Sequence, residues 1–177
     1  MILGMSTATF TALHVLISLV GIASGLVVMY GFFHANGFDR GTLLFFATTA
    51  LTSLTGFLFP NEHITPGIVI GILSMIILAV AAAARYGLRI RGLWRPVYVI
   101  TAAIALYFNC FVFVVQSFEK VPPLRALAPT QKEPPFQITQ LALLILFVVA
   151  TVFAVKRFRP DAGIVGSSPA ATQKRAA

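Results

Sequence analysis

Five long apolar segments, separated by short polar connections, constrain the fold of this 177-residue chain more than any other feature. They cover residues 10–33, 43–59, 67–84, 94–118 and 136–155. A helix needs about 20 mostly apolar residues to span a bilayer, and in hydrocarbon its backbone amides can pair within the same segment. The sequence therefore predicts an all-α integral membrane protein, with residues 1–159 forming a bundle of five transmembrane helices.

The composition agrees with a chain that is surrounded mainly by lipid. Only 10% of the residues are charged and 58% are hydrophobic, whereas about a quarter of the residues of a typical soluble domain are charged. The net charge of +8 is spread over the ends of the apolar segments rather than gathered in one patch, which argues against a nucleic-acid partner. The expected partners are membrane lipids, other membrane proteins or further copies of the chain.

The distribution of Lys and Arg predicts the orientation in the membrane. With five crossings, ten of the thirteen Lys and Arg residues fall on one side, together with the C-terminus. Cytoplasmic segments carry an excess of these residues. We therefore expect the N-terminus outside and the C-terminus inside. Residues 160–177 are small and polar without periodicity, which predicts a disordered cytoplasmic tail.

Polar side chains within the apolar segments form faces at helical spacing, and each one needs a partner in hydrocarbon. Hydrogen bonding and packing between helices is the favoured interpretation, and a ligand site or solute path is the alternative. The Gly21-x-x-x-Gly25 motif supports close packing. We expect Asn109, near mid-bilayer, to bond across to the threonines or to the first segment. The candidate residues are His14, Ser18, Thr48, Thr52, Asn109 and Gln116.

Two connections have unusual compositions. Five prolines between residues 119 and 135 predict an extended or turn-rich path without a regular helix, either as a lid over the outer end of the bundle or as a free linker. The sequence RYGLRIRGLWRP, residues 85–96, predicts a belt of arginines and aromatic residues that grips anionic headgroups, with a protein docking site as the alternative.

Reactive groups are sparse. We expect no buried Asp, Glu, Lys or Arg within the segments, since Arg95 lies at the very start of the fourth one, and this argues against a proton pump or ion-coupled carrier. A weak metal cluster of His14, Glu62 and His63 is conceivable, but the spacing does not require it. The histidine positions do not suit haem, and the single cysteine, Cys110, excludes an intrachain disulfide. We expect no catalytic residues, no resident metal and no cofactor.

The stretch YVITAAIALYFNCFVFVVQSFEKVPPLRALAPTQKEPPFQITQ, residues 98–140, resembles an uncharacterised family of small bacterial inner-membrane proteins with five predicted transmembrane helices. The Asn109 and Gln116 face, followed by ALAPTQKEPPF, carries most of the likeness. The resemblance extends from the first segment to the fifth. It implies a multi-pass protein of the bacterial cytoplasmic membrane, with an outward loop beside the Asn–Gln face, and it brings no catalytic residues.

Three functions follow as hypotheses. The first is a non-enzymatic protein: an accessory component, or a bundle that binds a lipid or small molecule between its helices. The second is a small transporter or channel for a neutral polar solute, with a path between the threonine face and Asn109–Gln116. The third, least favoured, is a metal or redox membrane enzyme that uses His14, Glu62 and His63.

Overall fold

The computed structural model describes residues 2–35, 37–60 and 65–159, and this part of the chain is all-helical apart from an isolated bridge between Ile2 and Met5. The all-α prediction is thus confirmed for the described residues. The elements are α1 (Thr7–Phe33), α2 (Asp39–Phe57), α3 (Pro66–Ala82), the π-helical turn η1 (Ala83–Gly87), α4 (Trp94–Lys120), α5 (Pro122–Leu127) and α6 (Pro134–Arg157).

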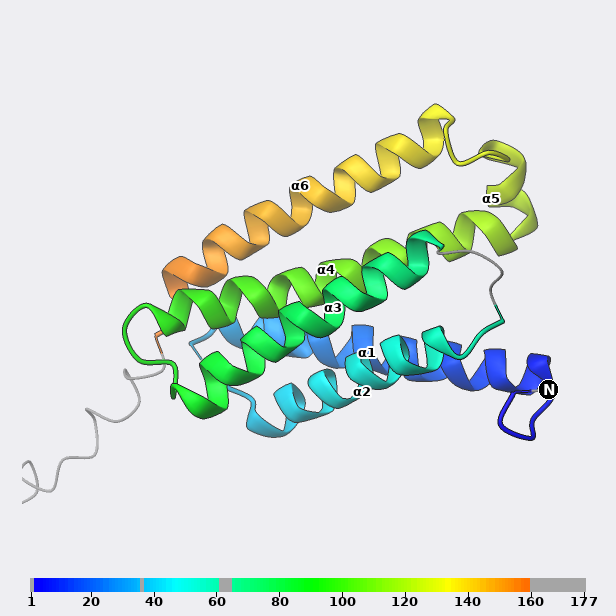
Figure 1. Cartoon of the computed structure of the whole chain (residues 1–177). Helices are drawn as coiled ribbons and strands as arrows, with labels where there is room; N and C mark the ends of the chain where they lie inside the picture. The colour runs from blue at the N-terminus through cyan, green and yellow to red at the C-terminus, as the bar shows by residue number, and fades with distance from the viewer. Residues whose placement is uncertain (1, 36, 61–64, 160–177) are drawn as a thin grey trace, which may run out of the picture.

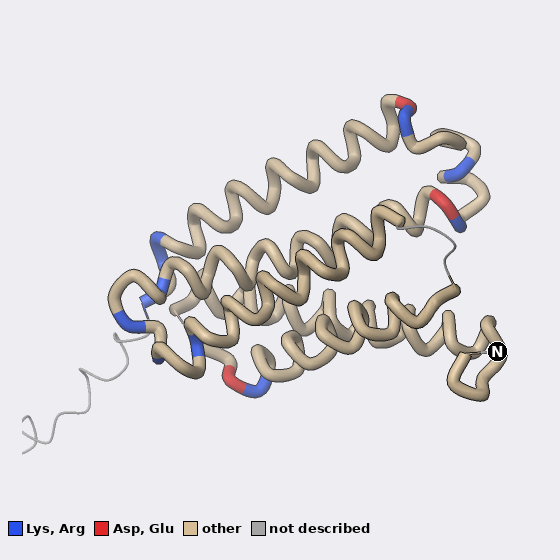
Figure 2. Tube along the Cα trace, viewed as in Figure 1, with Lys and Arg blue, Asp and Glu red and all other residues tan. Residues whose placement is uncertain are grey.

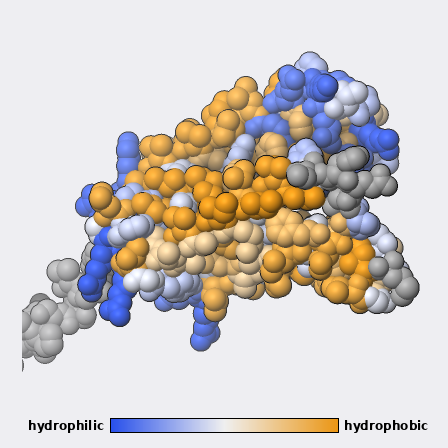
Figure 3. Space-filling view, in the orientation of Figure 1, coloured by the Kyte–Doolittle hydropathy of each residue, from blue (hydrophilic) through white to orange (hydrophobic). Residues whose placement is uncertain are grey.

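The five long helices run alternately in opposite directions, so that the start of α1 and the end of α6 lie at opposite ends of the bundle (Figure 1). Helix α4 is central and contacts α1, α3, α5 and α6. The charged residues of the described part gather at the two ends (Figure 2), and the face seen in Figure 3 is hydrophobic between them. An apolar band of this kind is what a bilayer requires of a spanning bundle.

Four helical segments of the described part are long and apolar enough to cross a membrane: Thr7–Phe33, Pro66–Gly87, Trp94–Lys120 and Pro134–Arg157. Helix α2 covers the remaining predicted segment but is shorter, with 19 residues, and it is richer in hydroxyl groups. These four segments indicate a multi-pass membrane protein, while a crossing by α2 stays a prediction.

Proline residues begin three of the described helices, and Pro66 starts α3. Pro122 and Pro123 start α5, and Pro134 and Pro135 start α6. The prediction that this region contains no regular helix was wrong for Pro122–Leu127. The first helical positions donate no intrahelical hydrogen bond, so a proline there removes nothing that the helix needs. The loop that follows α5 folds back on α4, because the Gln131 side chain donates to the Val115 carbonyl at 3.2 Å.

The third predicted segment ends later than expected. Beyond Ala82 the chain continues through the π-turn to Gly87, so Arg85 belongs to the continuous helical segment. The prediction that no Asp, Glu, Lys or Arg is buried within a segment was therefore wrong, because Arg85 is buried. The sequence did not predict this, because the apolar run of the third segment stops at Ala84, one residue before the arginine. The Arg85 guanidinium has partners on other helices, which are described below.

Glycine allows the closest helix contacts, as the GxxxG spacing predicted. A Cβ atom on Gly25 would lie 2.5 Å from Leu106 Cδ1 and 2.8 Å from Phe45 Cε2. A Cβ atom on Gly21 would lie 3.3 Å from Thr48 Oγ1. The two glycines thus admit side chains of α2 and α4 directly against the α1 backbone.

Candidate functional site

A row of polar groups, here called the polar seam, lies between α1, α2 and α4. It consists of His14, Thr49, Thr52, Thr55 and Asn109. The His14 Nδ1 atom is 2.8 Å from Thr55 Oγ1, which links α1 to α2. The Asn109 amide donates to Thr49 Oγ1 at 2.9 Å, which links α4 to α2. The expected bond from Asn109 to the threonines is thus present, and the seam holds three helices together.

Two other predicted residues adjoin the seam but satisfy themselves. The Thr48 hydroxyl donates to the Leu44 carbonyl of its own helix at 2.7 Å, and the Ser18 hydroxyl donates to the His14 carbonyl at 2.8 Å. Such bonds back to the preceding turn let a hydroxyl reside in an apolar helix without a partner elsewhere. Thr48 and Ser18 therefore add little to binding between the helices.

Gln116 does not join the seam, because its side chain is exposed on the C-terminal half of α4. Another glutamine contacts that helix: Gln140 of α6 donates to the Phe111 carbonyl at 3.3 Å. Two buried oxygens in the described part lack a hydrogen-bond partner, Thr52 Oγ1 of the seam and Gln140 Oε1. An unpartnered buried oxygen is costly, so each is a place where a polar ligand atom or a water molecule would be stabilised.

Two apolar side chains, here called the apolar plug, lie next to the seam on the side where α6 ends. Phe45 and Leu106 are almost fully buried, and both press against Gly25. On the other side of this plug lies Thr42, which belongs to a second polar group. The hydroxyl residues of α2 thus form two separate clusters rather than one continuous polar track.

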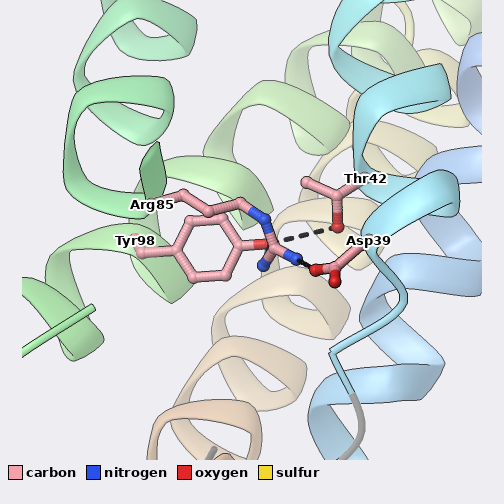
Figure 4. A network of polar contacts seen from close by, with 4 residues as sticks. All are labelled: Asp39, Thr42, Arg85 and Tyr98. Atoms are coloured by element: carbon pink, nitrogen blue, oxygen red, sulfur yellow. Dashed lines mark hydrogen bonds and ion pairs between the residues drawn. The ribbon is translucent and has the colours of Figure 1, made fainter. Parts of the chain in front are cut away.

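The second polar group surrounds a buried arginine (Figure 4). The Arg85 guanidinium donates to the Tyr98 hydroxyl at 2.9 Å and forms an ion pair with Asp39. Its Cζ atom lies 5.1 Å from the centre of the Tyr98 ring, and the Tyr98 hydroxyl is 3.3 Å from Thr42 Oγ1. Helices α2 and α4 are thereby joined to the π-turn, and a buried charge has the partners it requires.

The position of Arg85 revises the predicted belt of residues 85–96. Its side chain faces the helices rather than lipid headgroups, and Arg95 also turns inward, where it donates to the Phe158 carbonyl at the end of α6. Sequence reasoning missed Asp39 and Tyr98, although one signal was available. Asp39 is the single acidic residue between the first two segments, and the predicted topology puts it on the same side as the arginine-rich connection after the third segment.

A groove of about 310 Å³ separates α4 from α6 and is lined almost entirely by apolar atoms. On α4 its walls include Ile100, Ile104 and Tyr107, and on α6 they include Phe147 and Val148. The groove lies in the half of α4 that follows Arg95. Its chemistry suits an acyl chain or another elongated apolar group, and no polar contact would fix an oxygen-rich ligand there.

The structure does not test the predicted metal cluster of His14, Glu62 and His63 as a whole. Glu62 and His63 lie outside the described residues. Within the described ranges, no group of three or more His, Cys, Asp and Glu side chains could hold a metal ion. His14 instead contacts Thr55 and packs edge-on against Phe59, with ring centres 5.3 Å apart.

Comparison with known proteins gives no relative for this chain: no family model, no curated protein and no solved structure matches it. The function must therefore be argued from the polar groups and the groove.

Proposed function

We propose that the chain is a five-crossing protein of a bacterial cytoplasmic membrane, with its N-terminus outside and its C-terminus inside. The alternating directions of the five long helices support this topology (Figure 1). So does the charge distribution, since eight described Lys and Arg residues lie at the end where α6 finishes and three at the other. Helix α2 crosses despite its hydroxyl groups because α1 and α4 supply hydrogen-bond partners for several of them and α3 packs against the helix.

Within this setting we propose that the protein is a non-enzymatic lipid-binding bundle. The observation that carries the proposal is the apolar groove between α4 and α6, which is open along two membrane-spanning helices. The groove wall on α4 runs from Ile100 to Tyr107, and helical rise makes eight residues about 12 Å long. This length corresponds to most of one leaflet of hydrocarbon, which is about 15 Å thick.

The basic residues at the inner end of the groove indicate an anionic headgroup. The exposed Lys156 and Arg157 follow the α6 wall, whereas Arg95, which precedes the α4 wall, is bonded to the Phe158 carbonyl. A phosphate held near these cations would leave its acyl chain directed along the groove. Basic residues at the membrane surface attract anionic lipids of any kind. The groove, rather than the charge alone, therefore makes the site specific for a bound lipid.

The test is to count the lipid that remains on the purified protein. Native mass spectrometry in mild detergent should show a retained phospholipid, and Ile104→Trp, which fills the groove, should reduce its occupancy severalfold. Leu146→Trp is the matched control, because Leu146 is 62% exposed and does not line the groove. Equal occupancy in the two variants would contradict the proposal.

A transporter or channel for a neutral polar solute is the second candidate. The unpartnered Thr52 oxygen within the polar seam favours it. The plug of Phe45 and Leu106 opposes it, because transport would require these two side chains to move away from Gly25. Liposomes that contain the protein should then pass a small polyol faster than empty liposomes, and Asn109→Leu should slow the passage. Equal fluxes with and without the protein would reject this function.

A further inference from the structure

A second cavity lies at the opposite end of α4 from the basic end of the groove. It measures about 610 Å³ and is formed by the last turn of α4, by α5 and by the loop that follows. Phe118 and Pro129 provide apolar wall, and the charged residues Glu119, Lys120 and Arg125 also line it. An edge-on contact between Phe118 and Phe136, with ring centres 5.4 Å apart, ties this end of α4 to the start of α6.

The polar groups of the loop are already engaged. The Thr130 hydroxyl donates to Glu133 Oε1 at 2.8 Å, and the Gln131 amide donates to the Val115 carbonyl. These bonds shape the cavity wall, and they leave the Thr130 and Gln131 side chains with little capacity to bind a ligand. The binding capacity must come from the charged side chains.

The three charged side chains form no ion pair with one another or with any other residue that the structure describes. The only ion pair in the described part of the chain joins Arg85 and Asp39 at the other end of the bundle. Lys120 and Arg125 therefore present two positive charges to the cavity, and Glu119 presents one negative charge. A complementary ligand carries an anionic group able to accept from both cations, together with a smaller cationic group for the carboxylate.

We propose that this cavity binds the phosphoethanolamine group of a membrane phospholipid. The phosphodiester accepts hydrogen bonds from Lys120 and Arg125, and the primary ammonium donates to Glu119. A lipid source suits the location, because Val121 and Leu127, which lie between lining residues along the chain, are large apolar residues that remain exposed. This inference rests on the proposed membrane setting but not on the α4–α6 groove, which lies nearer the start of α4.

The experiment measures headgroup preference in detergent by native mass spectrometry, with equimolar phosphatidylethanolamine and phosphatidylglycerol of identical acyl chains. The wild type should retain the ethanolamine lipid in excess. Glu119→Gln should reduce that preference by up to about tenfold, because one charge-assisted hydrogen bond is lost. Lys120→Gln combined with Arg125→Gln should lower retention of both lipids. Lys132→Gln is the matched control, since Lys132 is an exposed cation of the same loop that does not line the cavity.

Two further measurements separate the possible outcomes. Ile104→Trp should leave the headgroup preference intact, so failure of the groove proposal and failure of this one can be told apart. Soluble phosphoethanolamine, added as a competitor, should displace the lipid only weakly, because it lacks acyl chains. No preference in the wild type, an unchanged preference in Glu119→Gln, or binding of the soluble compound as tight as that of the lipid would each overturn the proposal.

Discussion

Arg85 and Asp39 form an ion pair between residues 46 positions apart, in which the arginine side chain is 5% exposed and the aspartate side chain is 88% exposed. The pair is therefore asymmetric. Water can replace the arginine as the partner of Asp39, but little water can reach the guanidinium. The arginine is also held by the Tyr98 hydroxyl and ring, so the two partners should respond very differently to substitution.

Asp39→Asn should lower the free energy of unfolding by less than about 1 kcal/mol, because an exposed partner contributes little. Arg85→Ala should cost about 2–4 kcal/mol, since it removes the bond to Tyr98 and leaves unfilled space. Arg85→Lys should recover only part of this loss, because an ammonium cannot reproduce the planar fork. Unfolding in mixed micelles, titrated with a denaturing detergent, measures all three. Equal losses for Asp39→Asn and Arg85→Ala would contradict this assignment.

The bond from Asn109 to Thr49 should show measurable coupling. A double-mutant cycle with Asn109→Leu and Thr49→Val should give an interaction energy of about 0.5–1.5 kcal/mol, the range found for hydrogen bonds between membrane helices. Gln116→Leu is the control on the same helix, because Gln116 is exposed and makes no contact with the seam. An interaction energy of zero would contradict a hydrogen bond between Asn109 and Thr49.

Gly25 should tolerate no side chain. Gly25→Ala places a Cβ atom within 2.5 Å of Leu106 and 2.8 Å of Phe45, and overpacking of this kind costs about 1–3 kcal/mol. Gly87→Ala is the matched control, because no atom lies within 4 Å of the added Cβ. Thermal unfolding of the two variants in the same detergent should separate them by several degrees, and a similar midpoint would place the helices further apart than described.

The loop before α6 should depend on pH through Glu133. Desolvation raises the pKa of this carboxyl group, but hydrogen bonds from Thr130 and from the Lys132 backbone outweigh it, so the pKa falls below the ordinary value of 4.5. A lowered pKa in the folded state stabilises the loop at neutral pH, and this contribution disappears as the pH falls through the folded pKa.

Carbon-13 NMR of the Glu133 carboxyl should give a titration midpoint below 4.5. The thermal midpoints of the wild type and Glu133→Gln should differ at pH 7 and converge in acid. A Glu133 midpoint at or above 4.5, or a stability difference that grows in acid, would contradict the hydrogen-bond pattern.

Helix positions were predictable from the sequence because apolar length and helix periodicity are local properties. The predicted segments overlap the five long helices, with boundaries that differ by a few residues. The hydrogen bond of Asn109 was also foreseen, since an amide in an apolar helix must find a partner among few polar groups. Local patterns were less reliable where proline begins a helix, as in α5.

The arginine network and the cavities could not be found in this way. Arg85 looked like an interfacial residue because its neighbours on the chain are basic, and only the packing of α2 against α3 and α4 brings Asp39 and Tyr98 to it. Gln116 has the correct spacing to accompany Asn109, yet its side chain is exposed. Sequence spacing identifies the face of a helix on which a residue lies. Whether that residue is buried depends on how closely the neighbouring helices pack at its position.

The bond between Asn109 and Thr49 also has a consequence for biosynthesis. A ribosome completes α2 before it makes Asn109, and N-terminal segments generally fold first. In the proposed membrane setting, the newly inserted pair of α1 and α2 therefore exists for a time with Thr49 lacking its final partner. A hydroxyl that can turn back to its own helix tolerates this delay, whereas an asparagine at position 49 would not.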